Sequence, residues 1–229
     1  MLRNQSKKTR IAVFATLCTC VLAGTANAQQ QQQVAQVQIV ADGMCCNGCA
    51  QKVGAQLYTA PGVSNVQADV PNHLVTITFR PSPRLTLGGL WAATERADGK
   101  PSKLVTSQAV YTLQRPEQLR LTEPLQPGRY WVVVEKLGSE ESTAKAIKQL
   151  SSIRNVKSVS CDAPNRAFFL ETASSEPLSP WMLLAAVEQC GNSAQSITGP
   201  HGVFTVERPK QQAVQSTASQ KSQQQGIVR

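Results

Sequence analysis

The chain has 229 residues, of which 41% are hydrophobic, 16% charged and 5% aromatic, a composition that suits small domains better than one large core. Its formal net charge of +9 would fit a nucleic-acid or membrane-surface partner, whereas its two histidines exclude a His-rich metal site. It contains no stretch of about 20 apolar residues, which argues against a membrane-spanning helix.

Residues 1–28 have the pattern of a secretory signal peptide. Four basic and no acidic residues precede an apolar run at 11–23, and small residues follow up to Ala28. The alternative, a poorly anchored membrane helix, would have too few apolar residues to span a bilayer. Cleavage after Ala28 would lower the net charge from +9 to +5. We therefore expect a periplasmic or secreted protein in an oxidising compartment, with no nucleic-acid partner and no membrane span in the mature chain.

Polar segments flank and divide the remaining chain. Residues 29–33 are all glutamine, and residues 208–229 are rich in Gln and Ser. Neither segment can bury enough apolar surface to offset its ordering entropy, so we predict that both are disordered. A polar stretch at 114–126 that contains proline is expected to be a linker.

An internal repeat sets the expected domain organisation. Shifted by 93 positions, residues 34–113 align with 127–206 without a gap, and the turn at 69–72 falls on the similar turn at 162–165. A chance match would not keep both the turn and the apolar pattern in register. We therefore predict two homologous domains, at 34–113 and at 127–207.

Each unit shows the order β-α-β-β-α-β, so the predicted fold class is α+β, with two tandem ferredoxin-like domains. Val37 and Ile39 alternate with glutamines as in a strand, and Ala50, Val53 and Leu57 recur at helical spacing. In the first unit we predict strands at 34–41, 63–70, 74–79 and 104–113. A loop at 42–46 leads into a first helix that ends at about residue 58, and a second helix is predicted at 85–97. In the second unit we predict strands at 130–136, 156–161, 167–172 and 202–207, and helices at 143–152 and 180–190.

Three cysteines cluster where the first strand meets the first helix, in the sequence Gly43-Met44-Cys45-Cys46-Asn47-Gly48-Cys49. Two cysteines three positions apart at a helix start can direct both sulfurs to one point, and the helix N-terminus favours thiolate over thiol. Soft thiolates suit Cu(I) or Hg(II), whereas a closed Zn(II) site wants four ligands. A Cys-x-x-Cys pair also fits a redox site or a disulfide, although the proline common between redox cysteines is absent.

This motif resembles the heavy-metal-associated domain family of soluble copper chaperones, metal-pumping ATPases and the periplasmic mercury-binding protein. The family carries Gly-Met-x-Cys-x-x-Cys at this place in the same order of elements. The resemblance implies that Cys46 and Cys49 are the metal ligands, that Met44 plugs the core beneath the loop, and that Lys100 offsets the negative charge of the thiolates. Cys45 is either a third ligand or a spare thiol, and these two alternatives remain open.

The second unit keeps the fold pattern without the thiols. On the 93-residue offset, Gly138, Ser139 and Ser142 replace the three cysteines, and hydroxyls are poor ligands for soft metals. We expect Ser139 to cap the helix that follows it, and we expect no soft-metal site there. His73 and His201 fall at turns, where we expect surface residues and not ligands.

These patterns predict an exported soft-metal carrier, chaperone or scavenger without enzymatic activity. Cu(I) is the expected ion, with Hg(II) or Zn(II) as alternatives, and a metal-transporting or metal-accepting protein is the expected partner. Two other functions remain open: a thiol–disulfide redox protein that uses the same cysteines, and an interaction module in which metal binding is incidental.

Overall fold

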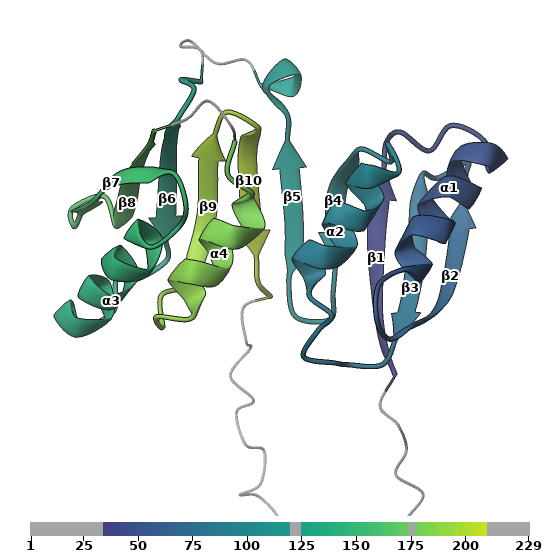
Figure 1. Ribbon diagram of the computed structural model, residues 1–229, viewed down its shortest axis with the longest axis horizontal. Helices are drawn as coiled ribbons and strands as arrows, with labels where there is room; N and C mark the ends of the chain where they lie inside the picture. The colour runs from purple at the N-terminus through teal and green to yellow at the C-terminus, as the bar shows by residue number, and fades with distance from the viewer. Residues whose placement is uncertain (1–33, 120–124, 174–176, 210–229) are drawn as a thin grey trace, which may run out of the picture. The chain divides into compact units, whose positions relative to one another are not determined.

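A computed structural model describes residues 34–119, 125–173 and 177–209 (Figure 1). We call residues 34–119 the first half and residues 125–209 the second half. The predicted signal peptide, the glutamine run and residues 210–229 lie outside the described residues. None of the helices in the described residues is both long and apolar enough to cross a bilayer.

The described residues form an α+β structure with ten strands and four α-helices, which confirms the α+β part of the predicted fold class. The first half contains β1 (Ala35–Ala41), α1 (Asn47–Tyr58), β2 (Val63–Asp69), β3 (Leu74–Phe79), α2 (Leu87–Arg96), β4 (Pro101–Val105) and β5 (Val110–Gln114). The second half contains β6 (Arg129–Val134), α3 (Glu140–Ser151), β7 (Val156–Asp162), β8 (Ala167–Thr172), α4 (Pro180–Glu188), β9 (Ala194–Gly199) and β10 (Gly202–Glu207).

The strands form one antiparallel sheet in the order β2-β3-β1-β4-β5-β10-β9-β6-β8-β7. Within the first half, β2-β3-β1-β4 with helices α1 and α2 is the ferredoxin-like arrangement. Both helices lie on one face of these strands (Figure 1). Alternation along β1 puts Val37 and Ile39 on that face, where they are buried.

The predicted single strand at 104–113 is wrong, because a tight turn divides this segment into β4 and β5. The Thr106 hydroxyl accepts hydrogen bonds from the backbone N–H groups of Gln108 and Ala109, at 3.1 and 2.9 Å. Thr106 N–H in turn donates to the Ala109 carbonyl at 2.9 Å. A threonine hydroxyl that bonds its own backbone in this way stabilises a turn against an extended strand. The second half likewise gains β9 ahead of the predicted strand at 202–207.

The segment predicted as a linker at 114–126 contains ordered structure. Gln114 is the last residue of β5, and Pro116–Gln118 form a short 3₁₀ helix. Residues 120–124 lie outside the described residues. Arg208, which we place at the start of the predicted tail, pairs with the Glu188 carboxylate and donates to the Ala194 carbonyl at 2.8 Å.

Strands β5 and β10 join the two halves with a self-complementary register. Thr112 pairs with Thr205, and Thr205 is the residue that corresponds to Thr112 on the 93-residue offset. Val110 pairs with Glu207, the equivalent of Gln114, and Gln114 pairs with Val203, the equivalent of Val110. Such reciprocal pairing is the pattern of a two-fold symmetric interface, here within one chain.

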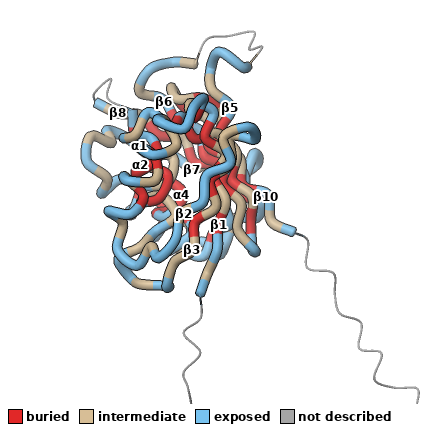
Figure 2. Tube along the Cα trace, turned by 90° about the vertical axis from the view of Figure 1, so that its right-hand side faces the viewer, coloured by how far each residue is buried: buried red, intermediate tan, exposed pale blue. Residues whose placement is uncertain are grey.

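An aromatic cluster packs beneath this junction. The Trp181 ring centroid lies 4.8 Å from Tyr111, 5.0 Å from Phe204 and 5.7 Å from Trp91. Trp91 belongs to α2 and Trp181 to α4, so helices from both halves meet there. Buried residues follow the strands and the inner sides of the helices (Figure 2), and they form one connected core cluster in the described residues.

Candidate metal centre

The loop that carries the cysteines is anchored at the end of β1 by Met44. The Met44 side chain is fully buried, and its N–H donates to the Ala41 carbonyl at 2.9 Å. The Cys45 N–H donates to the Gly43 carbonyl at 3.1 Å, which turns the chain before the helix begins. One buried apolar side chain therefore holds a loop whose neighbouring cysteines, Cys45 and Cys46, are exposed.

A close backbone contact holds the same loop against the segment that follows α2. The Gly43 N–H donates to the Gly99 carbonyl at 2.9 Å. A Cβ atom on Gly43 would overlap the Asp98 carbonyl oxygen. Glycine at position 43 is thus the residue that permits this approach.

Cys46 is the N-cap of α1. Its backbone is extended, and its sulfur accepts a hydrogen bond from the Cys49 N–H at 3.4 Å. A cysteine sulfur therefore occupies the place that serine or threonine oxygen usually takes at a helix start. The first turn of α1 contains no acidic residue, so no carboxylate competes with a thiolate for the positive end of the helix.

The three thiols converge at this helix start. The Sγ atoms of Cys46 and Cys49 lie 3.2 Å apart, and those of Cys45 and Cys49 lie 3.7 Å apart. All three sulfurs lie within 4.8 Å of one another. Among the described residues, these cysteines form the one group of three or more His, Cys, Asp or Glu side chains that is close enough to hold a metal ion. The structure thus brings together the three cysteines that the sequence singled out.

The local hydrogen bonds differentiate the two thiols of the pair. The pKa of Cys46 is lowered, chiefly because the Cys49 N–H donates to its sulfur and then because of the hydrogen bond between the Cys46 and Cys49 thiols. The pKa of Cys49 is raised, chiefly because its side chain hydrogen-bonds with the Cys46 thiol and then with the Cys45 thiol. Within the pair, Cys46 is therefore the thiol that ionises first as the pH rises.

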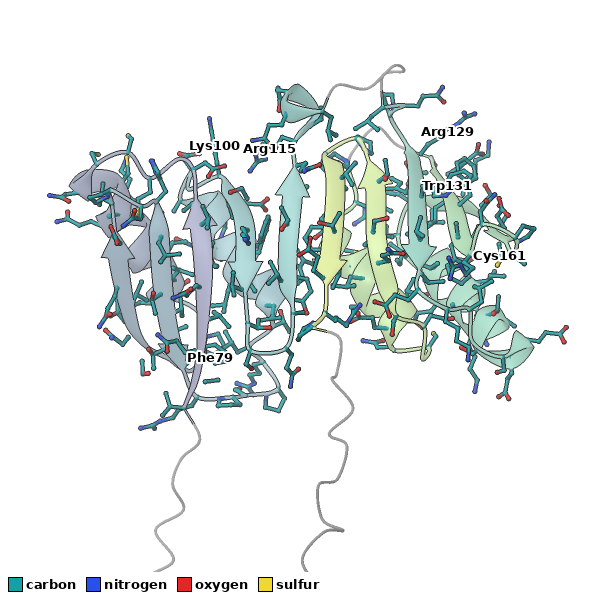
Figure 3. All side chains as sticks on the ribbon, turned by 180° about the vertical axis from the view of Figure 1, so that it is seen from behind. Phe79, Lys100, Arg115, Arg129, Trp131 and Cys161 are labelled. Atoms are coloured by element: carbon teal, nitrogen blue, oxygen red, sulfur yellow. The ribbon has the colours of Figure 1, made fainter. Side chains whose placement is uncertain are left out.

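Lys100 follows α2 in an exposed position with a left-handed backbone, φ 45°. Its carbonyl accepts from the Asp42 N–H at 3.2 Å. Figure 3 shows Lys100 and Arg115 at the same end of the sheet, and the Arg115 guanidinium donates to the Pro101 carbonyl at 3.1 Å. The Lys100 ammonium makes no hydrogen bond or ion pair with the thiols in the described part of the chain. Its charge-compensating role stays a prediction.

His73 is a site residue that the sequence reasoning missed. It lies in the turn between β2 and β3, and its Nδ1 is 3.0 Å from the Met44 carbonyl oxygen. Because a carbonyl oxygen only accepts, the imidazole donates this bond. The His73 carbonyl also accepts from the Ala41 N–H at 2.8 Å. The pairing of β3 with β1 is the signal that places this turn beside the cysteine loop.

The corresponding place in the second half is closed by hydrogen bonds. Ser139 caps α3 by accepting from the Ser142 N–H at 3.2 Å, which confirms the predicted cap. The Ser142 hydroxyl donates to the Cys190 carbonyl at 2.6 Å and accepts from the side chain of Asn192, which is 2% exposed. Asn192 also accepts from the Gly138 N–H at 2.9 Å. These groups satisfy one another and present no soft ligand.

Residues 39–97, which include the three cysteines, match the family described as the heavy-metal-associated domain. No curated protein matches the chain. Oxidized MerP from Ralstonia metallidurans CH34 is similar at 25% identity, covering 33% of this chain and 100% of its own, with a TM-score of 0.29. The putative copper-ion-binding protein from Bacillus anthracis str. Ames is 23% identical over 29% and 92%, with a TM-score of 0.27. The N-terminal soluble domains of Bacillus subtilis CopA are 15% identical over 72% and 94%, with a TM-score of 0.30.

Proposed function

Since residues 39–97 form a heavy-metal-associated domain, we propose that the chain is an exported carrier, chaperone or scavenger of a soft metal ion, with Cu(I) as its main cargo. The observation that carries the proposal is the thiol pair Cys46–Cys49, whose sulfurs lie 3.2 Å apart at an acid-free helix start. The Sγ atoms need to move apart by about 1.4 Å to bind one ion linearly between them, given a metal–thiolate bond of about 2.3 Å.

The choice of ion follows from ligand chemistry. Thiolates are soft donors and suit Cu(I) and Hg(II), whereas structural Zn(II) takes four ligands and the described cluster offers three. The cargo would move to a metal-transporting or metal-accepting protein by thiolate exchange. No catalytic step is involved, so the chain acts as a binding protein and not as an enzyme.

Copper stoichiometry tests the proposal. The protein lacking residues 1–28 is purified under a non-thiol reductant and titrated with Cu(I) against a chromophoric chelator. We expect one tightly bound ion per chain, lost in the Cys46→Ser, Cys49→Ser double variant. The matched control is the Cys161→Ser, Cys190→Ser double variant, which removes two thiols outside the cluster and should bind as the wild type does. Tight binding that survives removal of Cys46 and Cys49 would overturn the proposal.

The same thiol pair favours one competing function. A lowered pKa at Cys46 and a partner sulfur at 3.2 Å are also features of a thiol–disulfide redox protein. An insulin-reduction assay separates the two functions, because a metal carrier gives no turnover. A third function, an interaction module, would show as partner binding that the double serine variant leaves unchanged.

Export is proposed from the pattern of residues 1–28 alone. Fractionation of the producing cells, with mass spectrometry of the N-terminus, tests it directly. A mature chain that begins at residue 29 outside the cytoplasm supports the proposal, and an uncleaved cytoplasmic chain contradicts it. The division into domains at 34–113 and 127–207 is likewise proposed, and the reciprocal pairing of β5 with β10 supports it.

A further inference from the structure

We propose that Cys45 is a third thiolate ligand, so that the loop holds its ion in a three-coordinate site and retains it against transfer. This inference rests on the proposed function, because it concerns the same site and the same soft ions. It goes beyond the Cys46–Cys49 pair by assigning a role to a thiol that the pair does not need, and it favours a scavenger over a carrier.

The spacing of the sulfurs supports a three-coordinate site. With metal–thiolate bonds of about 2.3 Å, a trigonal ion places its sulfurs about 4.0 Å apart, and a linear ion places two sulfurs about 4.6 Å apart. Two separations here are 3.2 and 3.7 Å, and every separation is within 4.8 Å. The two measured separations therefore lie within about 0.8 Å of the trigonal spacing. A linear site would require a larger opening of the Cys46–Cys49 pair and would leave the Cys45 sulfur unused beside the ion.

The backbone of the loop also supports a ligand role for Cys45, because Cys45 lies between two residues whose positions are fixed. On one side, the Met44 side chain is fully buried and its carbonyl accepts from His73 at 3.0 Å. On the other side, Cys46 caps α1. The backbone entropy of placing a third thiol near the pair is therefore already lost on folding, which lowers the entropic cost of adding that ligand.

The consequence for transfer follows from coordination chemistry. An ion bound by two thiolates leaves a position open, and the thiolate of an acceptor protein can attack there. When Cys45 fills that position, an acceptor thiolate must first displace one of the three sulfurs. Three thiolates around divalent Hg(II) carry less net negative charge than three thiolates around monovalent Cu(I). The third ligand therefore improves the site for Hg(II) more than for Cu(I).

The test compares Cys45→Ser with the control Cys161→Ser in the protein lacking residues 1–28. X-ray absorption should count three sulfur neighbours in the Cu(I)- and Hg(II)-loaded wild type and in the control, and two in Cys45→Ser. Release of the ion to dithiothreitol should be about tenfold faster in Cys45→Ser, with affinity lower by a similar factor. Because Cys45 is exposed, the variant is expected to fold, which its far-UV circular dichroism would verify.

The outcomes separate this inference from the proposed function. Two sulfur neighbours in the wild type, or unchanged release and affinity in Cys45→Ser, would overturn the role of Cys45 while leaving the Cys46–Cys49 site intact. Failure of the wild type to bind any soft ion would instead overturn the proposed function itself.

Discussion

The imidazole Nδ1 of His73 lies 3.0 Å from the carbonyl oxygen of Met44 and ties the β2–β3 turn to the cysteine loop. The second half repeats this relationship with different chemistry, because Arg166, the equivalent of His73, donates to the Glu135 carbonyl at 2.7 Å. Both residues have a left-handed backbone, with φ of 52° and 50°. In each half, a turn residue thus reaches across to the segment that follows the first strand of that half.

The first prediction concerns the replacement His73→Asn. Asparagine tolerates the left-handed backbone but is too short to replace the imidazole contact. We expect the loss of one hydrogen bond, worth about 1 kcal/mol, to loosen the loop and to weaken Cu(I) binding about fivefold. The measurement is chelator competition, with hydrogen exchange at Cys45 and Cys46 as a second readout. Arg166→Asn is the matched control and should leave Cu(I) affinity unchanged; equal effects of both variants would argue against a positioning role for His73.

Much of the fold could be predicted because its signals are local. Alternation around Val37 and Ile39 indicated a strand, and the helix start at Cys46 followed from the motif and the apolar spacing after it. The turn at Thr106 was missed because the residues on both sides favour strands, so only the hydroxyl of one residue marks the break. The signal was present in the sequence but weak.

Other features could not be predicted because they depend on contacts between distant parts of the chain. The pairing of Thr112 with Thr205 requires a strand register that no local pattern determines. The contact of His73 with Met44 depends on the placement of β3 beside β1. The sequence likewise indicated a surface position for His201, whereas its ring packs against Tyr130 at a centroid distance of 6.0 Å.

The second prediction concerns thiol reactivity. The pKa of Cys46 is lowered by the Cys49 N–H, and the pKa of Cys49 is raised by its bonds with the neighbouring thiols. As pH falls from 9 towards 6, Cys46 should therefore stay alkylatable by iodoacetamide after Cys49 has become unreactive. Peptide mass spectrometry of briefly alkylated, metal-free protein measures the ratio. If Cys49 reacts first at low pH, the assignment of Cys46 as the leading thiolate is wrong.

The third prediction is a pH dependence of stability that arises from His201. Burial lowers the pKa of His201 to about 4, against an ordinary value of about 6.5 in an unfolded chain. Below pH 6.5 the unfolded chain binds a proton that the folded chain excludes, so stability is lost as pH falls towards 4, by up to about 3 kcal/mol. Urea unfolding at several pH values measures this loss.

The control for this dependence is His201→Phe. Phenylalanine keeps a ring beside Tyr130 and removes Nε2, which is buried without a hydrogen-bond partner in the described residues. The variant should be at least as stable as the wild type at pH 7 and should lose less stability between pH 6.5 and pH 4. An equally steep loss in the variant would assign the pH dependence to other groups.

The fourth prediction concerns Ser142→Ala in the closed site of the second half. The substitution removes the acceptor for the buried Asn192 amide and the donor for the Cys190 carbonyl. Leaving these groups unpaired should cost about 1–3 kcal/mol in the free energy of unfolding. Copper binding should not change, because the cysteine cluster belongs to the other half. A variant that loses copper while staying folded would contradict the assignment of the metal site to the first half alone.

The last prediction contrasts two tryptophans with opposite exposure. Trp91 is 2% exposed and contacts both Trp181 and Phe204 of the second half. Trp131 is 39% exposed and contacts Phe169 at a centroid distance of 5.2 Å. Figure 3 labels it on β6, where its neighbours Tyr130 and Val132 face the core. Trp91→Ala should therefore cost about 3–5 kcal/mol of stability, and Trp131→Ala about 1 kcal/mol.

Urea unfolding followed by far-UV circular dichroism measures both costs, and in Trp91→Ala the fluorescence of the two remaining tryptophans, Trp131 and Trp181, reports on the second half. Because Trp91 lies in the first half but packs on aromatic rings of the second, Trp91→Ala should lower the unfolding midpoint seen by both signals together. A fluorescence midpoint that stays at the wild-type value would mean that the two halves unfold independently and that the aromatic cluster does not couple them.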